Sequence, residues 1–249
     1  TLPDSTSDMP SAIDAGSNAI TVAASADLTG VTFTNPDNLT INASQTVSMT
    51  AAQVTAFNAG GTLTNSGTLN VSGTGDLSAQ DLGGVTKLTL SGDATLPDST
   101  SDMPSAIDAG SNAITVAASA DLTGVTFTNP DNLTINAGQT ATLTLAQLTA
   151  FEAGGTLTNS GTLNVTTASG DLSADNLSVV DGTLTLSGDA TLPDSTSDMP
   201  SAIDAGSNAI TVAASADLTG VTFTNPGNLT VTFGNTLTLT LAQMDAFQA

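Results

Sequence analysis

The chain has 249 residues and a formal net charge of −22, since 23 acidic residues stand against a single Lys or Arg. It contains no His or Cys, which excludes His-based catalytic triads, thiol chemistry, disulfides and His or Cys metal sites. The charge leaves no basic patch, so we expect no nucleic-acid partner, and no apolar run is long enough for membrane insertion.

Small residues dominate the chain, while 39% of residues are apolar and 3% are aromatic. Such side chains fill a thin core but not a wide one, which favours a narrow, regular fold. Glu152 is the only Glu among the 23 acids. Because Asp prefers turns and Glu prefers helices, this bias predicts many turns and few helices.

One stretch, which begins Thr-Leu-Pro-Asp and ends Thr-Asn-Pro, occurs three times without a change, at residues 1–36, 95–130 and 191–226. Internal repeats at a fixed period are typical of solenoids, propellers and arrays of modules. Copying gives every candidate catalytic residue a twin, which favours a function based on length, surface or valency. The repeats are 1–94, 95–190 and the partial 191–249, and we expect them to form one continuous domain over residues 1–249.

Within a repeat, short strands with strict apolar and polar alternation follow one another, separated by turn residues. Cutting at every second strand gives rungs, which we define as single circuits of the chain around the fold. We expect short helices at two corners. The first strands are 88–90, 114–116, 133–135 and 163–165; the second strands are 94–96, 120–122, 140–143 and 170–172; the rungs are 88–113, 114–132, 133–161 and 162–183; the corner helices are 101–107 and 146–151.

Rungs of this length predict an all-β fold, a parallel β-solenoid of about eleven rungs with a few short corner helices. The alternative is a series of tandem Ig-like β-sandwiches, because one sandwich takes up about 100 residues. The strand pattern recurs four times in each repeat, and no Trp or Tyr is present to fill a core between two sheets. Both observations favour the solenoid.

Stacking of rungs in register predicts columns of side chains. One outward column is expected to carry Asp on alternate rungs, because carboxylates about 4.8 Å apart repel by a few kcal/mol near a protein surface. The predicted inward columns are Leu88, Ile114, Leu133, Leu163 and Leu90, Val116, Ile135, Val165; the predicted Asp column is Thr95, Asp121, Thr140 or Ala141, Asp171, Thr191 and Asp217.

The composition argues against catalysis. Polysaccharide lyases need a cationic base, and Lys87, the only cation, is replaced by Thr183 in the second repeat. We therefore predict no enzyme and no catalytic, cofactor-binding or metal site. Calcium is the one cofactor left open, because Asp and Asn in turns supply hard oxygen ligands; the alternative is that these side chains are simply solvated. The candidate ligands are Asp98, Asp102, Asp108 and the turn 129–132.

Two motifs carry a resemblance that covers nearly the whole chain. The pattern Leu-Thr-x-x-Gln-(Leu/Val)-x-Ala-Phe and the sequence Gly-Thr-Leu-Thr-Asn-Ser-Gly-Thr-Leu-Asn-Val resemble the repetitive regions of bacterial surface adhesins and extracellular fibres. The resemblance implies a protein that is extracellular or on a cell surface, with a structural or adhesive role. It assigns no functional residue.

The two ends of the chain differ in how far they depart from the repeats. The chain starts in mid-pattern at Thr1, so we expect a processed product or a segment of a longer protein. After Pro226 the copying fails: Asp131 is replaced by Gly227, and a Phe appears at position 233. Because a solenoid exposes strand edges at its ends, we predict that the chain binds itself end to end as a filament or stalk. The alternative is an adhesive module that presents repeated sites to a surface or glycan ligand.

Overall fold

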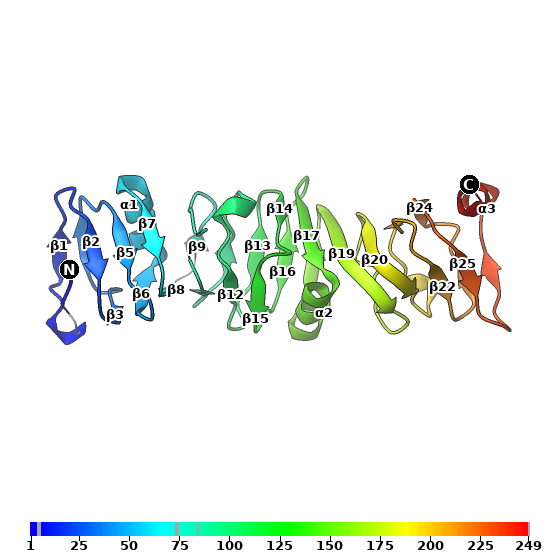
Figure 1. Cartoon of the computed structure of the whole chain (residues 1–249), viewed down its shortest axis with the longest axis horizontal. Helices are drawn as coiled ribbons and strands as arrows, with labels where there is room; N and C mark the ends of the chain where they lie inside the picture. The colour runs from blue at the N-terminus through cyan, green and yellow to red at the C-terminus, as the bar shows by residue number, and fades with distance from the viewer. Residues whose placement is uncertain (4–5, 73–74, 84, 249) are drawn as a thin grey trace. The chain divides into compact units, whose positions relative to one another are not determined.

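The computed structural model describes residues 1–3, 6–72, 75–83 and 85–248. Short strands pair in parallel with the strands one rung further along the chain, and three short α-helices lie between them (Figure 1). An Ig-like sandwich would require antiparallel sheets instead. The protein is therefore an all-β parallel β-solenoid with a few short helices, as the sequence predicted.

The chain divides into two compact units. The first consists of Thr1–Ala120, Gly124–Thr134 and Gly154–Thr156, and the second of Asp121–Thr123, Ile135–Ala153 and Leu157–Ala249. These boundaries do not coincide with those of the sequence repeats at 94 and 190. The single continuous domain over residues 1–249 stays a prediction.

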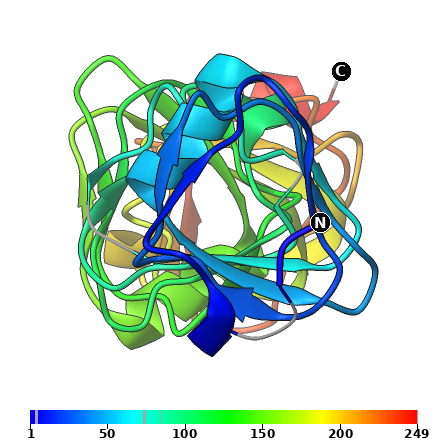
Figure 2. The same cartoon turned by 90° about the vertical axis from the view of Figure 1, so that its left-hand side faces the viewer.

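In the first unit, successive strands occupy three faces in turn. The first face holds β1 (Ala12–Asp14) and β4 (Thr32–Thr34). The second face holds β2 (Ile20–Val22), β5 (Leu39–Ile41) and β7 (Leu63–Asn65). The third face holds β3 (Ala26–Asp27), β6 (Thr46–Thr50) and β8 (Thr68–Ser72). In Figure 2 the first rung, in blue, is seen end on as straight segments joined at corners.

Alternating side chains build the core of this unit. Ile20 pairs with Leu39 and Leu39 with Leu63, so these two rungs take up 19 and 24 residues. Val22, Leu39 and Ile41 are fully buried, while Thr21 and Thr40 between them reach the surface. Burying one Val, Leu or Ile side chain contributes about 1.5–3 kcal/mol, and each rung buries its apolar residues against the next.

The remaining strands repeat this arrangement. In the first unit they are β9 (Gly75–Asp76), β10 (Leu88–Thr89), β11 (Ala94–Thr95), β12 (Ala106–Asp108), β13 (Ile114–Val116) and β15 (Thr126–Thr128). The residues of β14 (Ala120–Asp121) and β16 (Leu133–Ile135) are divided between the two units, and β18 (Leu157–Asn159) belongs to the second. The second unit holds β17 (Thr140–Thr144), β19 (Thr162–Asp171), β20 (Leu184–Thr191), β21 (Ala202–Asp204), β22 (Ile210–Val212), β23 (Ala216–Asp217), β24 (Thr222–Thr224), β25 (Leu229–Val231) and β26 (Leu237–Thr238).

Where one repeat meets the next, the third face of the first repeat continues as the first face of the second. In the first unit, β8 on the third face contacts β10, which pairs with β12 at the position of β1 in the next repeat. In the second unit, Val165 of β19 pairs with Leu184, and Leu184 pairs with Ile203 of β21. A repeat therefore does not hold a whole number of rungs, and the repeated stretch shifts by one face at each junction.

All eight residues of the predicted inward columns are buried, and β13 neighbours β16 as the columns require. The shift makes the steps from Leu88 to Ile114 and from Leu133 to Leu163 wrong. Leu88 pairs with Ile107, whereas Ile114 pairs with Ala94, so Leu88 and Ile114 lie on different faces. Leu163 pairs with Ala141 rather than with Leu133. All faces carry the same alternation of apolar and polar residues, so the alternation did not reveal which strand stacks on which.

The predicted column with Asp on alternate rungs is also wrong. Asp171 pairs with Thr191, and Thr191 pairs with Thr211. Asp121 is not in this column. The residue after it, Leu122, donates its main-chain N–H to the carbonyl of Thr142, so Asp121 lies beside the strand that contains Thr142. Charge repulsion between stacked Asp residues therefore does not explain the length of the repeat.

In the part of the chain that the structure describes, the corners contain three α-helices and three 3₁₀ turns. The predicted helix at 146–151 is confirmed, but residues 101–107 are not one helix, because a 3₁₀ turn is followed there by β12. The α-helices are α1 (Ala51–Gly60), α2 (Leu145–Gly154) and α3 (Leu241–Gln248), and the 3₁₀ turns are Thr6–Asp8, Thr100–Asp102 and Thr196–Asp198.

A glutamine near the start of each helix ties it to the rung before it; this glutamine is buried in α1 and α3 and half-buried in α2, where Gln147 donates to the carbonyl of Leu122. In α1, the Gln53 side chain donates to the main-chain carbonyls of Leu28 at 2.5 Å and Val31 at 2.7 Å, and accepts from the N–H of Thr50 at 2.7 Å. Thr50 in turn accepts from the N–H of Gln53, which completes a capping box. In α3, Gln243 donates to Leu218 and Val221 in the same way, at 2.6 Å each.

We predict that Gln53→Met lowers the free energy of unfolding by about 3 kcal/mol, because removing a partner from a buried polar group costs about 1–3 kcal/mol per group. Urea titration followed by far-UV circular dichroism measures this loss. The control is Thr55→Ala on the exposed side of α1, which should change stability by less than about 0.5 kcal/mol. Equal midpoints for Gln53→Met and the wild type would contradict the role of the glutamine.

The end of each long corner helix lies against the main chain of the preceding rung. A Cβ added to Gly60 would lie 1.8 Å from the carbonyl oxygen of Pro36, and one added to Gly154 would lie 1.9 Å from that of Pro130. No side chain fits at that distance, so the sequence needs glycine at both places for a close approach.

We predict that Gly60→Ala destabilises the chain by about 3 kcal/mol, the upper end of the usual cost of overpacking, as measured by thermal unfolding. Gly30→Ala is the matched control, because nothing lies within 4 Å of a Cβ at Gly30. The control should keep or slightly raise stability, since Ala restricts the unfolded chain. If the two variants melt together, the close approach is not essential.

Candidate functional site

Most of the carboxylates for which a hydrogen bond is described accept it from a main-chain N–H or a side chain within a turn. The Asp27 side chain accepts hydrogen bonds from the N–H of Thr29 at 3.0 Å and from its hydroxyl at 2.7 Å. Asp217 makes the same two bonds with Thr219. The bond from the Thr29 main chain is the largest cause that lowers the pKa of Asp27, and the Thr219 main chain does the same for Asp217. These groups stay ionised because the turn stabilises the charge.

Asp108 has partners on two sides. It accepts from the Lys87 ammonium at 2.8 Å and from the Asn129 amide at 3.0 Å. The hydrogen bond from Lys87 is the main cause that lowers the pKa of Asp108. Lys87 is 40% exposed, and an ion pair of this kind contributes about 0–1 kcal/mol.

Asn129 is the candidate ligand that contacts Asp108, but it does so by donating its amide N–H rather than by offering an oxygen. The remaining candidates have other partners. Asp102 accepts from the hydroxyl of Ser101 at 3.0 Å, and the Asn132 side chain accepts from the N–H of Thr156 at 2.9 Å. The main-chain N–H of Asp98 donates to the carbonyl of Ser78. Within residues 1–3, 6–72, 75–83 and 85–248, no three acidic side chains come together in a way that could hold a metal ion.

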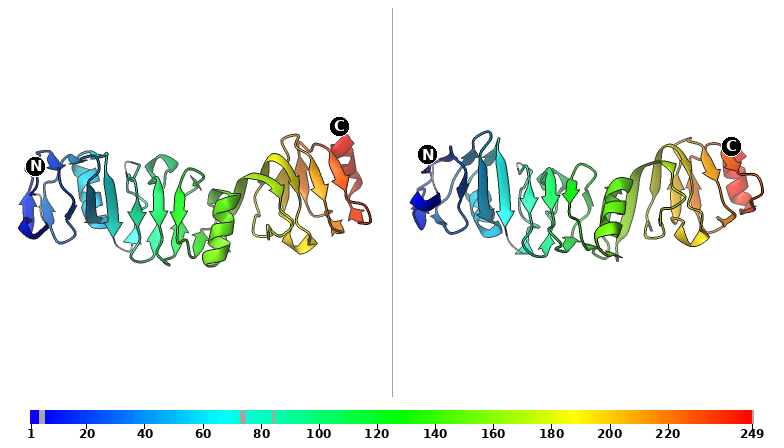
Figure 3. Two further views of the ribbon diagram at one scale, coloured as in Figure 1. Left: turned by 60° about the horizontal axis from the view of Figure 1, so that its bottom comes forward. Right: turned by 90° about the horizontal axis from the view of Figure 1, so that it is seen from below.

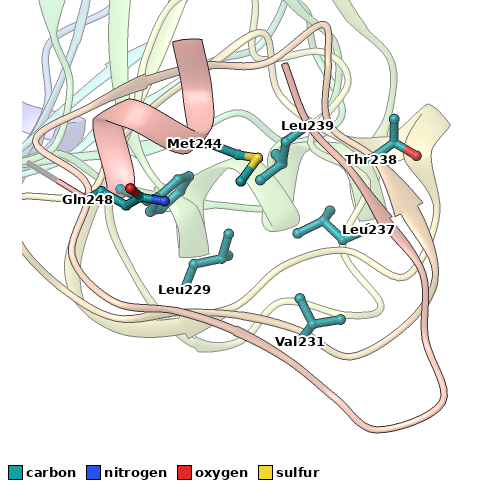
Figure 4. Close-up of a pocket in the computed structure, with 8 residues that line it drawn as sticks. Leu229, Val231, Leu237, Thr238, Leu239, Met244 and Gln248 are labelled. Carbon is teal, nitrogen blue, oxygen red and sulfur yellow. The ribbon is translucent and has the colours of Figure 1, made fainter. Parts of the chain in front are cut away.

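The most distinctive surface of the second unit is an open groove at its C-terminal rung, with a volume of about 510 Å³. Figure 4 shows that Leu229, Leu239 and Met244 point into the same space. We call this the terminal groove. Its apolar lining consists of Leu229, Val231, Leu237, Leu239, Met244 and Phe247, with Thr238 and Gln248 completing it.

Apolar side chains in the terminal groove are unusually exposed. Val231 is 39% exposed and Met244 is 45% exposed. Two neighbours outside the groove are more exposed still, Leu241 at 79% and Phe233 at 102%. Large apolar side chains that gather on a surface usually mark an interaction site.

The same positions are covered inside the first unit. Their counterparts in the first repeat are all fully buried: Leu39, Ile41, Val47, Met49, Val54 and Phe57. They are buried because β7 pairs with β5 and β8 pairs with β6. The terminal groove therefore consists of positions that a following rung covers in the first repeat.

The covering rung also takes up polar groups. In the first unit, the N–H of Ser66 donates to the carbonyl of Ile41 at 3.0 Å, and the N–H of Thr68 to that of Gln45 at 2.8 Å. The N–H of Thr62 donates to the Asn38 side chain at 2.9 Å. The corresponding acceptors at the terminal groove have no such donor among the described residues: the carbonyls of Val231 and Asn235 and the side chain of Asn228.

The side chains that form the wall of the terminal groove are arranged like their covered counterparts in the first unit. The rings of Phe223 and Phe247 are 5.0 Å apart at 59°, and those of Phe33 and Phe57 in the first unit are 5.0 Å apart at 62°. Helix α3 contacts β24 and carries the buried Gln243 (Figure 3, red). The helix is therefore seated as α1 is, although none of the residues up to 248 that the structure describes forms a rung over it.

The N-terminal rung is also less covered than its internal copies. Leu2 and Ile13 are half-buried, whereas their counterparts Leu96 and Ile107 are 1% and 0% exposed. In the second repeat this surface is covered by the preceding rung, where the N–H of Leu77 donates to the carbonyl of Thr95. The sequence predicted exposed edges at both ends, and the drift after Pro226 was the signal that pointed to the C-terminal one.

Comparisons with protein-family profiles, with curated proteins and with solved structures gave no match to this chain. Among the helices in the described part of the chain, none is both long enough and apolar enough to cross a membrane.

The second unit contains an acidic pair where the first repeat has amides. Glu152 on α2 stands at the position of Asn58, and Asp175 at that of Gln80. Burial raises the pKa of Glu152 above its ordinary value, and the charge of Asp175 raises it further. Burial also raises the pKa of Asp175, with a contribution from Asp171.

We predict that Glu152→Gln stabilises the second unit at pH 7, and that the gain disappears as the pH falls below about 4.3, the pKa of an unfolded Glu. A carboxyl with a raised folded pKa destabilises the fold only while it is ionised, so the penalty is complete above the folded pKa. Urea midpoints of variant and wild type between pH 3.5 and pH 8 measure the difference.

Asp217→Asn is the control of opposite sign. The lowered pKa of Asp217 means that its carboxylate favours folding at pH 7, and that this contribution is lost as the pH falls through the lowered value. A Glu152→Gln gain that does not change with pH would contradict a raised pKa at Glu152.

Proposed function

We propose that the chain is a non-enzymatic structural segment of an extracellular β-solenoid shaft, which associates through its terminal rung with a further solenoid chain to form a filament or stalk. The carrying observation is the terminal groove, because the six apolar side chains that line it are fully buried at the same positions of the first repeat. Covering them again would bury the same surface between chains.

The chemistry of the other residues supports a structural role. Carboxylates such as Asp27 and Asp217 hold turns in place, and their copies recur in each repeat. A function that depends on length and stacking is compatible with such copying, whereas a pocket with unique residues is not. The extracellular location rests on the resemblance to adhesin and fibre repeats.

Charge sets the condition for association. Two chains that each carry a net charge of −22 repel one another at low ionic strength, but this repulsion is screened beyond about 8 Å at 0.15 M salt. The groove lining itself is uncharged. Association should therefore strengthen as salt is added, in contrast to contacts that depend on opposite charges.

We predict that the mean mass of the wild type in analytical ultracentrifugation rises with protein concentration at 0.15 M salt, and that electron microscopy shows uniform fibres. Met244→Glu places a charge in the groove and should keep the chain monomeric at the same concentrations. Thr55→Glu adds the same charge on α1 in the first unit, at a residue that does not line the groove, and should associate like the wild type. A wild type that stays monomeric at every concentration would overturn the proposal.

A further inference from the structure

We propose that the terminal groove is a strand-accepting site for a polypeptide segment of the type Gly-Thr-Leu-Thr-Asn-Ser-Gly-Thr-Leu-Asn-Val, which enters as a further rung in parallel pairing. This inference rests on the proposed function and names the chemistry of the partner. The partner is an uncharged segment with two short strands, which place Leu-Thr-Asn on the second face and Leu-Asn-Val on the third.

The first repeat contains this complex within one chain. The segment at residues 61–71 covers the surface that corresponds to the groove: Leu63 pairs with Leu39, and Asn65 with Ile41. On the third face, Leu69 pairs with Val47 and Val71 with Met49. The second repeat has the same segment at residues 155–165, where Leu163 pairs with Ala141 and Val165 with Leu143.

The main-chain groups of the groove fit the same segment. In the second unit, the N–H of Ser160 donates to the carbonyl of Ile135 at 3.0 Å, and the N–H of Thr162 to that of Gln139 at 2.7 Å. Val231 and Asn235 hold these two positions at the groove. Such main-chain bonds give affinity when a strand is added to an open edge, while alternate side chains give selectivity.

One glycine makes the site selective. A Cβ added to Gly67 would lie 2.4 Å from the carbonyl oxygen of Gln45 and 2.6 Å from that of Asn42. At Gly161 in the second repeat the corresponding distances are 2.3 Å and 2.5 Å. The segment must therefore carry glycine between its two strands, since a single methyl group would push it off the acceptor carbonyls.

The acceptor needs little rearrangement. The Phe223–Phe247 pair and the buried Gln243 already have the geometry of their covered counterparts. A preformed site loses less conformational freedom on binding. The segment carries no charge, so it can approach a chain of net charge −22 without repulsion.

Fluorescence anisotropy of a labelled synthetic peptide with the sequence of residues 61–72 tests the proposal on the full chain. We expect saturable binding at one site, little change between 0.05 M and 0.5 M salt, and at least tenfold weaker binding of a peptide with Gly67→Ala. Met244→Glu and Val231→Asp should each weaken binding at least tenfold, while Thr55→Glu leaves it unchanged. Circular dichroism confirms that each variant is folded.

Equal binding of the Gly67→Ala peptide or of a scrambled peptide would overturn the proposal. A peptide of residues 1–22 that binds more tightly would also overturn it, in favour of the N-terminal rung of a second copy as the occupant. If the chain forms fibres but does not bind the peptide of residues 61–72, this inference fails while the proposed function stands. If it binds the peptide but stays monomeric, the proposed self-association fails instead.

Discussion

The apolar side chains of each rung of this protein are buried only because the next rung packs on them. Leu39 and Ile41 are fully buried because β7 lies on them, and the carbonyl of Ile41 has a partner because Ser66 follows one rung later. Side chains this small enclose no interior by themselves. Stability is then a sum of contacts between neighbours, so the surface that holds the fold together and the surface that is open to a partner are the same surface.

Polar groups help to fix the corners. Gln53 and Gln243 donate to main-chain carbonyls of the rung before each helix, and removing a hydrogen-bond partner from a buried polar group is costly. At the exposed turns, Asp27 and Asp217 hold the local main chain by accepting its N–H groups. Much of the acidity thus belongs to the folding of turns, and a basic partner is not needed to explain it.

The sequence was enough to predict the fold class, strands such as 114–116 and 133–135, and the helix around Phe151, because alternation and three-residue spacing are local signals. It did not predict the pairing of Leu88 with Ile107, because every face carries the same alternation. The role of Gln53 was hidden too, since its partners Leu28 and Val31 lie more than 20 residues away. The drift after Pro226 pointed to the position of the terminal groove, but its lining was not predicted, because the side chains that line it depend on the pairing between rungs.

The shift by one face at each junction has a consequence for how the identical copies meet the outside. In the first unit, Thr21 of the first copy stacks with Thr40 and Thr64, while its twin Thr115 stacks with Thr95 and Asp76 in a separate sheet. The two threonines have the same neighbours in sequence but point in different directions. A flat, rigid ligand that binds one of these copies therefore cannot bind the other at the same time. Duplication here produces binding surfaces that face different directions, and it does not increase avidity for a single flat surface.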